Sequence, residues 1–338
     1  MSRFGNQIKR YNMNIETRIL TVLLFAALAF PACNKKPIAP EVPASAPVGF
    51  RTMSQANWVK AGTADFPYDD FGVWGIARKA NVQSPYILWD NFTQVSKDED
   101  SNIYEPTTAA YWVQDYTYHF LAVAPYGDEG FTLTGITQKT STVNDKLSFS
   151  YDISPKYEAS NYGFDLLGAA SGTTVDRAGY NTAQGITFLH LFTRVRISAT
   201  FADCDSGSLS RIVLRNVDTQ ADYAISYDSD GELTVDCISD GETGQMSLEA
   251  DGETAEFYMV PQDMSDVELY VDFTITINGN ERTAENVMIN MSNALNGQVY
   301  PYNHPYNWNL TITPKTISFE ATVTQWMDST TNPEIEIK

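Results

Sequence analysis

Much of the chain alternates apolar and polar side chains with the period of two that is typical of β-strands. Between residues 267 and 277 the odd positions are apolar, and the even positions are charged or polar. Such a strand buries one face and exposes the other, because successive side chains point to opposite sides. Residues 194–201 and 317–324 repeat this pattern. The sequence therefore predicts antiparallel sheets with one solvated face.

Three further runs are apolar at consecutive positions, and they lie at residues 71–77, 116–126 and 185–192. Continuous apolar runs of this length are typical of strands that are covered on both faces. We therefore expect central strands there, with side chains packed above and below the sheet.

Turn signals separate these runs. Asp-Gly at 230–231 and Asn-Gly-Asn at 278–280 predict tight hairpins, since these residues accept positive φ. Pro-Lys at 314–315 predicts another reversal. A stretch rich in Gly, Ser, Thr and Ala, residues 168–185, predicts a loop between two β domains. Short helices are expected only within residues 284–296.

The predicted fold class is therefore all-β. We expect two consecutive antiparallel β-sandwich domains, formed by residues 48–178 and 179–338. Apolar residues make up 43% of the 338-residue chain, which suffices for such cores, and the 19 tyrosines and 17 phenylalanines favour strands.

The N-terminus carries an export signal, residues 1–32. Residues 19–30, ILTVLLFAALAF, are uniformly apolar and follow several basic side chains. This run suits a signal peptide and is shorter than the roughly 20 residues of a membrane-spanning helix. Translation could begin at Met1 or at Met13. Cys33 follows Ala32 in a context that resembles the bacterial lipobox, which predicts lipidation of Cys33; ordinary cleavage near Ala29 or Ala32 is the alternative.

A tether follows the signal. Residues 33–47 contain four prolines and many small side chains. Pro-rich segments favour an extended conformation of about 3.1 Å per residue, so this segment would hold the folded part away from a membrane.

Charge excludes one class of partner. The first 32 residues hold four basic side chains and one acidic one, so the remainder carries 18 basic and 41 acidic side chains. A surface this acidic repels phosphate backbones, and we therefore expect no nucleic-acid partner.

Candidate chemistry is sparse. Cys204 and Cys237 could form one disulfide in an exported protein or remain thiols. His119 and His190 lie in apolar strands, where a core role is expected, and no His or Cys spacing suits a metal. No nucleophile elbow or phosphate-binding loop occurs. The sequence predicts no enzyme activity, no metal and no cofactor.

Aromatic side chains gather near the C-terminus, where exposed rings could stack on sugars, or buried rings could fill a core or a subunit interface. The residues of this cluster are Tyr300, Tyr302, Tyr306 and Trp308.

Several segments, in order, resemble the fimbrillin family of Bacteroidetes lipoproteins. The lipobox and tether are followed by Phe50-Arg51-Thr52 and by Trp58. The remaining matching segments are DDFGVW (69–74), YHFLAVAPY (118–126), DLLGA (165–169), FLHLFTRV (188–195), NWNLTI (307–312), ISF (317–319) and VTQW (323–326).

This resemblance implies two transthyretin-like β-sandwiches and a subunit of a surface fimbria. It implies localisation at the outer membrane through the lipid anchor, and other fimbrial subunits as partners, in support of adhesion to a surface glycan or protein. It also implies proteolytic maturation after Arg51, which removes the first strand so that a neighbouring subunit can donate its own. The C-terminal residues 332–338 could be that donated strand or an edge strand.

A second interpretation comes from a different functional class. The chain could be a surface lipoprotein that binds glycans and does not polymerise, with the aromatic residues 300–308 as the binding site.

Overall fold

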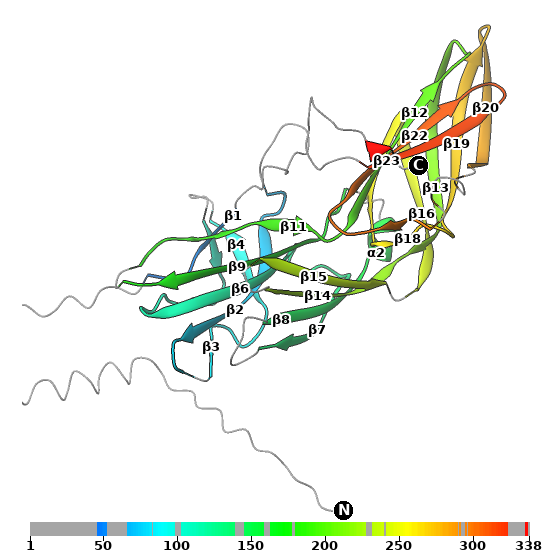
Figure 1. Cartoon of the computed structure of the whole chain (residues 1–338). Helices are drawn as coiled ribbons and strands as arrows, with labels where there is room; N and C mark the ends of the chain where they lie inside the picture. The colour runs from blue at the N-terminus through cyan, green and yellow to red at the C-terminus, as the bar shows by residue number, and fades with distance from the viewer. Residues whose placement is uncertain are drawn as a thin grey trace, which may run out of the picture. The chain divides into compact units, whose positions relative to one another are not determined.

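The computed structural model describes residues 46–52, 66–82, 84–98, 103–138, 145–158, 163–177, 180–227, 232–239, 241–289, 291, 295, 297–323 and 335–336. Strands dominate these ranges, which confirms the predicted all-β class (Figure 1). The described residues all belong to one compact unit, Ser45–Lys338.

The N-terminal sheet begins the described part of the chain. Its strand order is β10 (Gln184–Ile186), β1 (Phe50–Thr52), β5 (Tyr104–Pro106), β4 (Thr93–Lys97), β2 (Asp70–Lys79), β6 (Tyr116–Ala124), β9 (Leu167–Val175) and β11 (Phe188–His190), and β3 (Tyr86–Ile87) pairs with β2.

This sheet curls so that β10 approaches β9. The Ser171 hydroxyl of β9 donates to the Gly185 carbonyl of β10 at 2.6 Å, and the Gln184 amide donates to the same hydroxyl at 2.6 Å. A cluster rich in aromatic side chains, which we call the aromatic cluster, fills the concave side. Its aromatic members are Phe50, Phe71, Trp89, Tyr104, Trp112, Tyr118, Phe120 and Phe188. The curl places β1 in the wall of this enclosure rather than at an open edge.

The central strands of the sheet are covered on both faces, as the continuous apolar runs predict. In β6, Phe120 and Ala122 pack into the aromatic cluster, whereas Leu121 and Val123 join a second cluster on the opposite face. Burial in β2 is equally continuous, from Phe71 to Ala77.

A four-stranded sheet covers the convex face of the N-terminal sheet. Its order is β15 (Leu233–Ser239), β14 (Gln220–Tyr227), β8 (Lys146–Asp152) and β7 (Phe131–Thr137). The short helix α2 (Ser154–Glu158) follows β8, and the Asp152 carboxylate accepts from its first backbone N–H at 2.9 Å.

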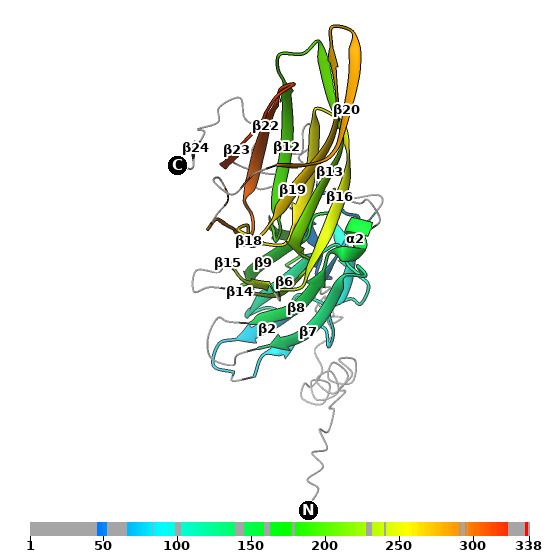
Figure 2. The same cartoon turned by 90° about the vertical axis from the view of Figure 1, so that its right-hand side faces the viewer.

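A C-terminal sheet contains most of the remaining strands (Figure 2). Its order is β20 (Asn280–Ile289), β19 (Glu268–Ile277), β13 (Ser206–Asp218), β16 (Thr243–Gly252), β17 (Thr254–Met259), β12 (Thr193–Phe201), β22 (Pro305–Ile312), β23 (Ile317–Val323) and β24 (Ile335–Glu336). A small ladder pairs β18 (Gln262–Asp263) with β21 (Val299–Tyr300).

The predicted alternation and hairpins are confirmed in this part of the chain. In β12 the odd positions from Thr193 to Ala199 are buried and the even positions are more exposed. Asn278 and Gly279 connect β19 to β20 with φ values of 51° and 73°, as expected for their residue types.

The predicted loop at residues 168–185 is wrong for its first half, because Leu167–Val175 forms β9 between β6 and β11. The small side chains have a packing role there. A Cβ added to Gly168 would come within 2.9 Å of the Leu191 side chain, so this strand accepts only a small residue at that position.

The predicted helix within residues 284–296 is also wrong over residues 284–289, which belong to β20. The hairpin at Asn278-Gly279 pairs this segment with β19, from Ile277↔Asn280 to Leu269↔Ile289. Tertiary pairing therefore decides the local conformation, although Ala and Met favour helices.

The predicted central strand at residues 185–192 is divided in two. β10 pairs with β1, whereas β11 pairs with β9.

Sheet pairing also links residues on the two sides of residue 178, since β14 pairs with β8 along seven residues. The division into sandwiches at 178/179 stays a prediction.

Candidate functional site: β1 and its groove

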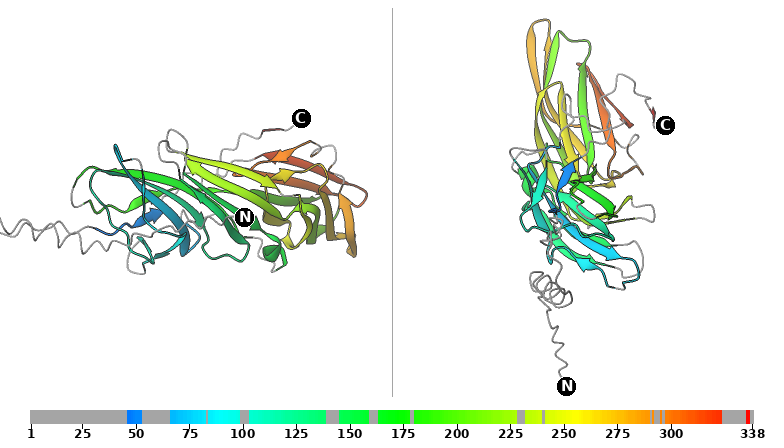
Figure 3. Two further views of the ribbon diagram at one scale, coloured as in Figure 1. Left: turned by 90° about the horizontal axis from the view of Figure 1, so that it is seen from below. Right: turned by 90° about the vertical axis from the view of Figure 1, so that its left-hand side faces the viewer.

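Residues 46–52 form a segment that ends in β1 and is bonded on both sides. On one side, the Val48 N–H donates to the Ala110 carbonyl at 2.8 Å, and Trp112 N–H donates to the Ala46 carbonyl at 3.1 Å. On the other side, β1 runs parallel to β10, and the Gln184 N–H donates to the Gly49 carbonyl at 2.8 Å. β1, in blue in Figure 3, is thus an interior strand of the N-terminal sheet.

Two side chains of this segment occupy the aromatic cluster completely. Val48 and Phe50 have no exposed surface, whereas Pro47 and Arg51, which alternate with them, are exposed. The Phe50 ring meets Phe120 edge-on at a centroid distance of 5.0 Å and Phe71 at 5.9 Å. Segment 46–52 therefore fills a groove between β5 and β10, which we call the β1 groove.

Gly49 lies close to Ile103, the residue before β5. A Cβ at this position would lie 3.1 Å from Cγ2 of Ile103, which is tighter than ordinary van der Waals contact, so a larger residue would require the Ile103 side chain to shift.

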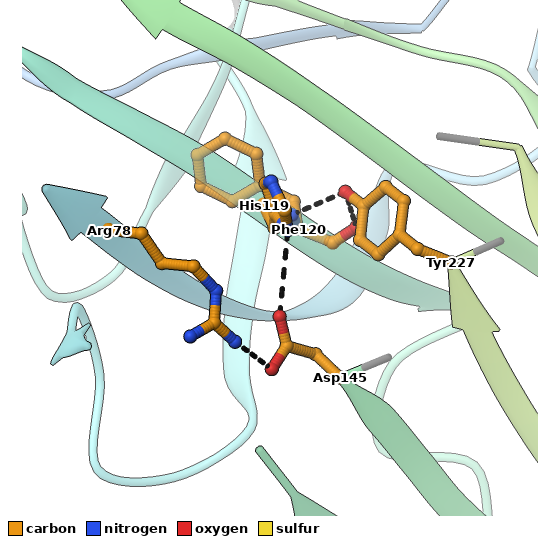
Figure 4. Close-up of polar contacts among 5 residues, drawn as sticks. All are labelled: Arg78, His119, Phe120, Asp145 and Tyr227. Atoms are coloured by element: carbon orange, nitrogen blue, oxygen red, sulfur yellow. Dashed lines mark hydrogen bonds and ion pairs between the residues drawn. The ribbon is translucent and has the colours of Figure 1, made fainter. Parts of the chain in front are cut away.

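The floor of the groove is fixed from behind. The Tyr227 hydroxyl, from β14, accepts from the Phe120 N–H and donates to the Phe120 carbonyl, both at 2.7 Å (Figure 4). Burial raises the Tyr227 pKa well above its usual value, so the phenol stays protonated and can donate. This contact ties the strand that carries Phe120 to the four-stranded sheet.

A buried ionic cluster lies beside this contact. The Asp145 carboxylate is wholly buried, and it meets Arg78 Nη2 at 2.5 Å and His119 Nδ1 at 3.5 Å (Figure 4). Removing one partner of such a cluster would leave a buried charge uncompensated, so the cluster fixes β2 and β6 against the loop before β8.

Arg51 lies directly after the buried Phe50, and its side chain is exposed. Its backbone pairs with Gly185 of β10. Residues 53–65 lie outside the described ranges, and Phe66 is the next described residue. The Phe66 ring stacks on Phe188 at 4.8 Å and meets Tyr104 at 5.8 Å, so the chain is anchored in the same cluster on both sides of that interval.

The sequence matches a family of known proteins. A family model described as fimbrillin-like aligns with residues 61–326, which is most of the chain. The chain belongs to the fimbrillin-like family. This membership supports a role at the cell surface, as a fimbrial subunit or adhesin. It favours a structural role over a catalytic one. No curated protein matches the sequence.

Solved structures resemble this fimbrillin-like chain at low identity. A cell adhesion candidate from Bacteroides uniformis is 17% identical with a TM-score of 0.49, over 83% of this chain and 98% of its own. A fimbrial protein from Bacteroides vulgatus is 15% identical with a TM-score of 0.48, over 83% and 99%. A fimbrial assembly protein from Parabacteroides distasonis is 9% identical with a TM-score of 0.40, over 86% and 99%. The family assignment rests on the sequence match.

The predicted lipidation site, Cys33, lies outside the described residues, as do the signal peptide and most of the tether. None of the helices in the described ranges has the length and hydropathy needed to cross a bilayer.

The two remaining cysteines are free thiols on different elements. Cys204 precedes β13, and Cys237 lies in β15. Burial raises the pKa of the Cys237 thiol to about 11, and its contact with the Tyr223 hydroxyl opposes that shift. Of the two alternatives that the sequence leaves open, the structure contains the thiols.

Most of the C-terminal aromatic cluster is buried. Tyr300 and Tyr306 stack at a centroid distance of 3.6 Å, and Trp308 Nε1 donates to the Tyr300 hydroxyl at 3.0 Å. All three side chains are at most 5% exposed, so their faces are closed to a ligand. Tyr302 is half-buried and alone keeps an accessible surface.

The two strand histidines have polar partners in the core. His190 Nδ1 contacts the buried Asp165 carboxylate, and His119 faces Asp145. Within the described ranges, no group of three or more ligating side chains is arranged to hold a metal.

Sequence reasoning missed the side chains that build the β1 groove, because they come from strands far apart in the chain. The inward positions of the strand itself were detectable, since Ala46, Val48 and Phe50 alternate with Pro47 and Gly49. The Tyr227 contact behind the groove had no sequence signal.

Proposed function

We propose that this protein is a structural subunit of a cell-surface fimbria, as stalk, anchor or tip, and that it assembles by strand exchange at the β1 groove. One observation carries the proposal. β1 is an interior strand, and Val48 and Phe50 of segment 46–52 are fully buried, yet residues 46–51 all lie upstream of the bond that follows the exposed Arg51. One cleavage there would make a central structural element removable.

Burial energetics explain why the emptied groove would take up another strand. Val48 and Phe50 are completely buried, and burial of such side chains contributes roughly 1.5–3 kcal/mol each. Without them, the aromatic floor and the backbone groups of β5 and β10 would face water. An extended strand from another subunit can restore both the ladder and the buried side chains.

Such a contact joins different surfaces of the two subunits. The acceptor offers its groove and the donor offers a strand, so the contact is head-to-tail. Head-to-tail contacts that do not close into a ring generate filaments.

Export and assembly would be coupled through the same cleavage. A lipid on Cys33 would anchor the newly exported chain to the outer membrane, since each buried methylene contributes about 0.8 kcal/mol. Water, with an arginine-specific protease, would hydrolyse the Arg51–Thr52 peptide bond. The anchor and the first strand would then leave together, because both lie upstream of that bond.

The C-terminus offers one candidate for the donated strand. Ile335–Glu336 forms β24, a two-residue strand at the edge of the C-terminal sheet that pairs with Thr322 and Val323 of β23. A pairing this short would permit release. Ile335 and Ile337 would supply the alternating apolar side chains.

Maturation and assembly can be tested on the exported chain. We expect an arginine-specific protease to yield a new N-terminus at Thr52, identified by mass spectrometry. SDS-resistant ladders should then appear when a donor subunit is present. Arg51→Ala should abolish both results.

Arg177→Ala provides the matched control, because Arg177 is also exposed but lies after β9, away from β1. It should leave the cleavage at Arg51 and the ladders unchanged. Surface fimbriae that contain this protein with residues 33–51 intact would contradict the proposal.

A further inference from the structure

A groove of about 790 Å³ lies beside the four-stranded sheet. Its floor is formed by residues of β8, β14 and β15, most of them outward-pointing, together with the inward-pointing Tyr223, Val235 and Cys237. Its wall is formed by the segment around Tyr302, which connects β21 to β22. The volume falls within the roughly 300–1,000 Å³ that is typical of small-ligand sites. The β1 groove is a separate feature, formed by other strands.

The floor combines polar side chains with a few apolar ones, such as Ala224 and the 69% exposed Ile238. Inward positions of the sheet, such as Phe149 and Tyr223, fill the core, and the alternate positions face outward. Ser148, Asp222 and Asp236 are among those outward residues. The Asp222 carboxylate accepts from the Ser150 hydroxyl at 2.6 Å, which orients it along the floor.

The wall is apolar and rigid. Val299, Pro301 and Tyr302 line it, and Val299 is 62% exposed. The Thr193 hydroxyl donates to the Pro301 carbonyl at 2.8 Å, and a His304 ring nitrogen meets the Tyr302 carbonyl at 2.8 Å. The stacked Tyr300 beneath them is fully buried. The wall is therefore preorganised, which reduces the entropy lost on binding.

The charge of the groove restricts its ligands. Asp222 and Asp236 line it together with one cation, Lys146, in a chain of net charge −20. Anionic ligands are disfavoured there. Carboxylates accept strong hydrogen bonds from uncharged hydroxyl donors, and serine hydroxyls can donate or accept.

We propose that this groove binds a neutral oligosaccharide. The hydroxyl groups of a sugar would bond to the Asp and Ser side chains of the floor, and the apolar C–H face would pack against Tyr302 and Pro301. A polar floor opposite an apolar, aromatic wall matches the two kinds of surface that a sugar ring presents. This site goes beyond the structural role proposed above, and it does not depend on cleavage at Arg51 or on strand exchange.

The test uses the Arg51→Ala monomer, so that assembly cannot contribute. It is applied to an array of neutral, sialylated and sulfated oligosaccharides. We expect retention of neutral glycans only. Tyr302→Ala should weaken that binding by about tenfold, the loss of one stacking contact, and Tyr302→Phe should restore it. Asp222→Ala should also weaken it.

Tyr86→Ala is the matched control, because Tyr86 lies in β3 and is 55% exposed. It should leave glycan binding unchanged, and thermal melting should show that every variant is folded. Three results would overturn the proposal: no neutral glycan bound at about 1 mM, the weak limit of specific binding; a preference for acidic glycans; or binding that Tyr302→Ala leaves intact. If glycan binding failed while SDS-resistant ladders still formed in the cleavage experiment, the glycan site would be wrong and strand exchange would remain supported.

Discussion

Segment 46–52, which contains β1, and strand β12 both carry fully buried side chains but are held by backbone pairing of very different extent. Val48 and Phe50 of the segment, and Val195 and Ile197 of β12, have no exposed surface. β12 pairs with β22 along eight residues and with β17 along six. β1 pairs along three residues with β10 and at one with β5. Equal burial with a short ladder suits a strand that can be replaced.

The largest loss of stability is expected around β12, the more extensively paired of the two strands. Trp308 is fully buried and pairs with Ile197 of β12. Trp308→Ala should lower the free energy of unfolding by about 3–5 kcal/mol, because it leaves a large cavity. Urea denaturation measures this loss. Met288→Ala, at a 57% exposed site on β20, should change stability by less than about 0.5 kcal/mol.

A smaller and more local effect is expected for β1. Phe50→Ala would remove packing comparable to that lost in Trp308→Ala. The loss of stability cannot exceed the free energy with which β1 docks into its groove, because once β1 has undocked, the substitution destabilises the protein no further. We expect about 2–3 kcal/mol, which is less than the roughly 3–5 kcal/mol that is usual for such a substitution in a core. Cleavage at Arg51 should become faster, as followed by limited proteolysis.

The control for Phe50→Ala is Tyr86→Ala, which removes an aromatic ring at a 55% exposed position of the same sheet. It should leave the cleavage rate nearly unchanged. If Phe50→Ala unfolded the C-terminal sheet together with β1, the two strands would not differ as proposed.

Packing on the face of the N-terminal sheet opposite the β1 groove can be tested through β9. Gly168→Val should destabilise the protein by about 1–3 kcal/mol, because its side chain would collide with Leu191. Thermal melting measures this change. Gly135→Ala is the control, since an added Cβ there meets no atom within 4 Å. Equal melting temperatures for the two variants would show that β9 tolerates larger residues.

The smallest expected effect is on the reactivity of the Cys237 thiol, which lies in the four-stranded sheet behind the β1 groove. Because burial raises its pKa to about 11, the folded thiol stays neutral at pH 8. An ordinary thiol has a pKa of about 8.5, so iodoacetamide should modify Cys237 about 100-fold more slowly in the folded than in the urea-denatured protein.

The sign of the pH dependence follows from the same shift. The unfolded thiol ionises first, so this contribution to stability is fully present below about pH 8 and is lost as the pH rises towards 11. Equal alkylation rates in folded and denatured protein would contradict the burial of Cys237.

Part of this fold was accessible from the sequence because some residues carry local information. Asn278 and Gly279 accept positive φ wherever they occur, and the alternation in residues 267–277 requires one buried face. β9 was missed because its glycines and alanines are set by the size of neighbours such as Leu191, which are distant in sequence.

The candidate site was accessible to a similar extent. Arg51 and the preceding strand follow from family resemblance and alternation. The groove itself depends on Phe120, Phe71 and Trp89, which three different segments bring together. The burial of Tyr300 and Trp308, and the remaining exposure of Tyr302, depend on pairing between β12 and β22, which no local pattern reveals.

Capture of a free strand by the cleaved protein tests the central claim most directly. A fluorescent peptide of residues 45–51, SAPVGFR, is mixed with the chain before and after cleavage at Arg51, and binding is followed by fluorescence anisotropy. We predict that only the cleaved chain captures the peptide, and that a peptide carrying Phe50→Asp is not captured. A cleaved chain that stays folded and binds neither peptide would contradict the account.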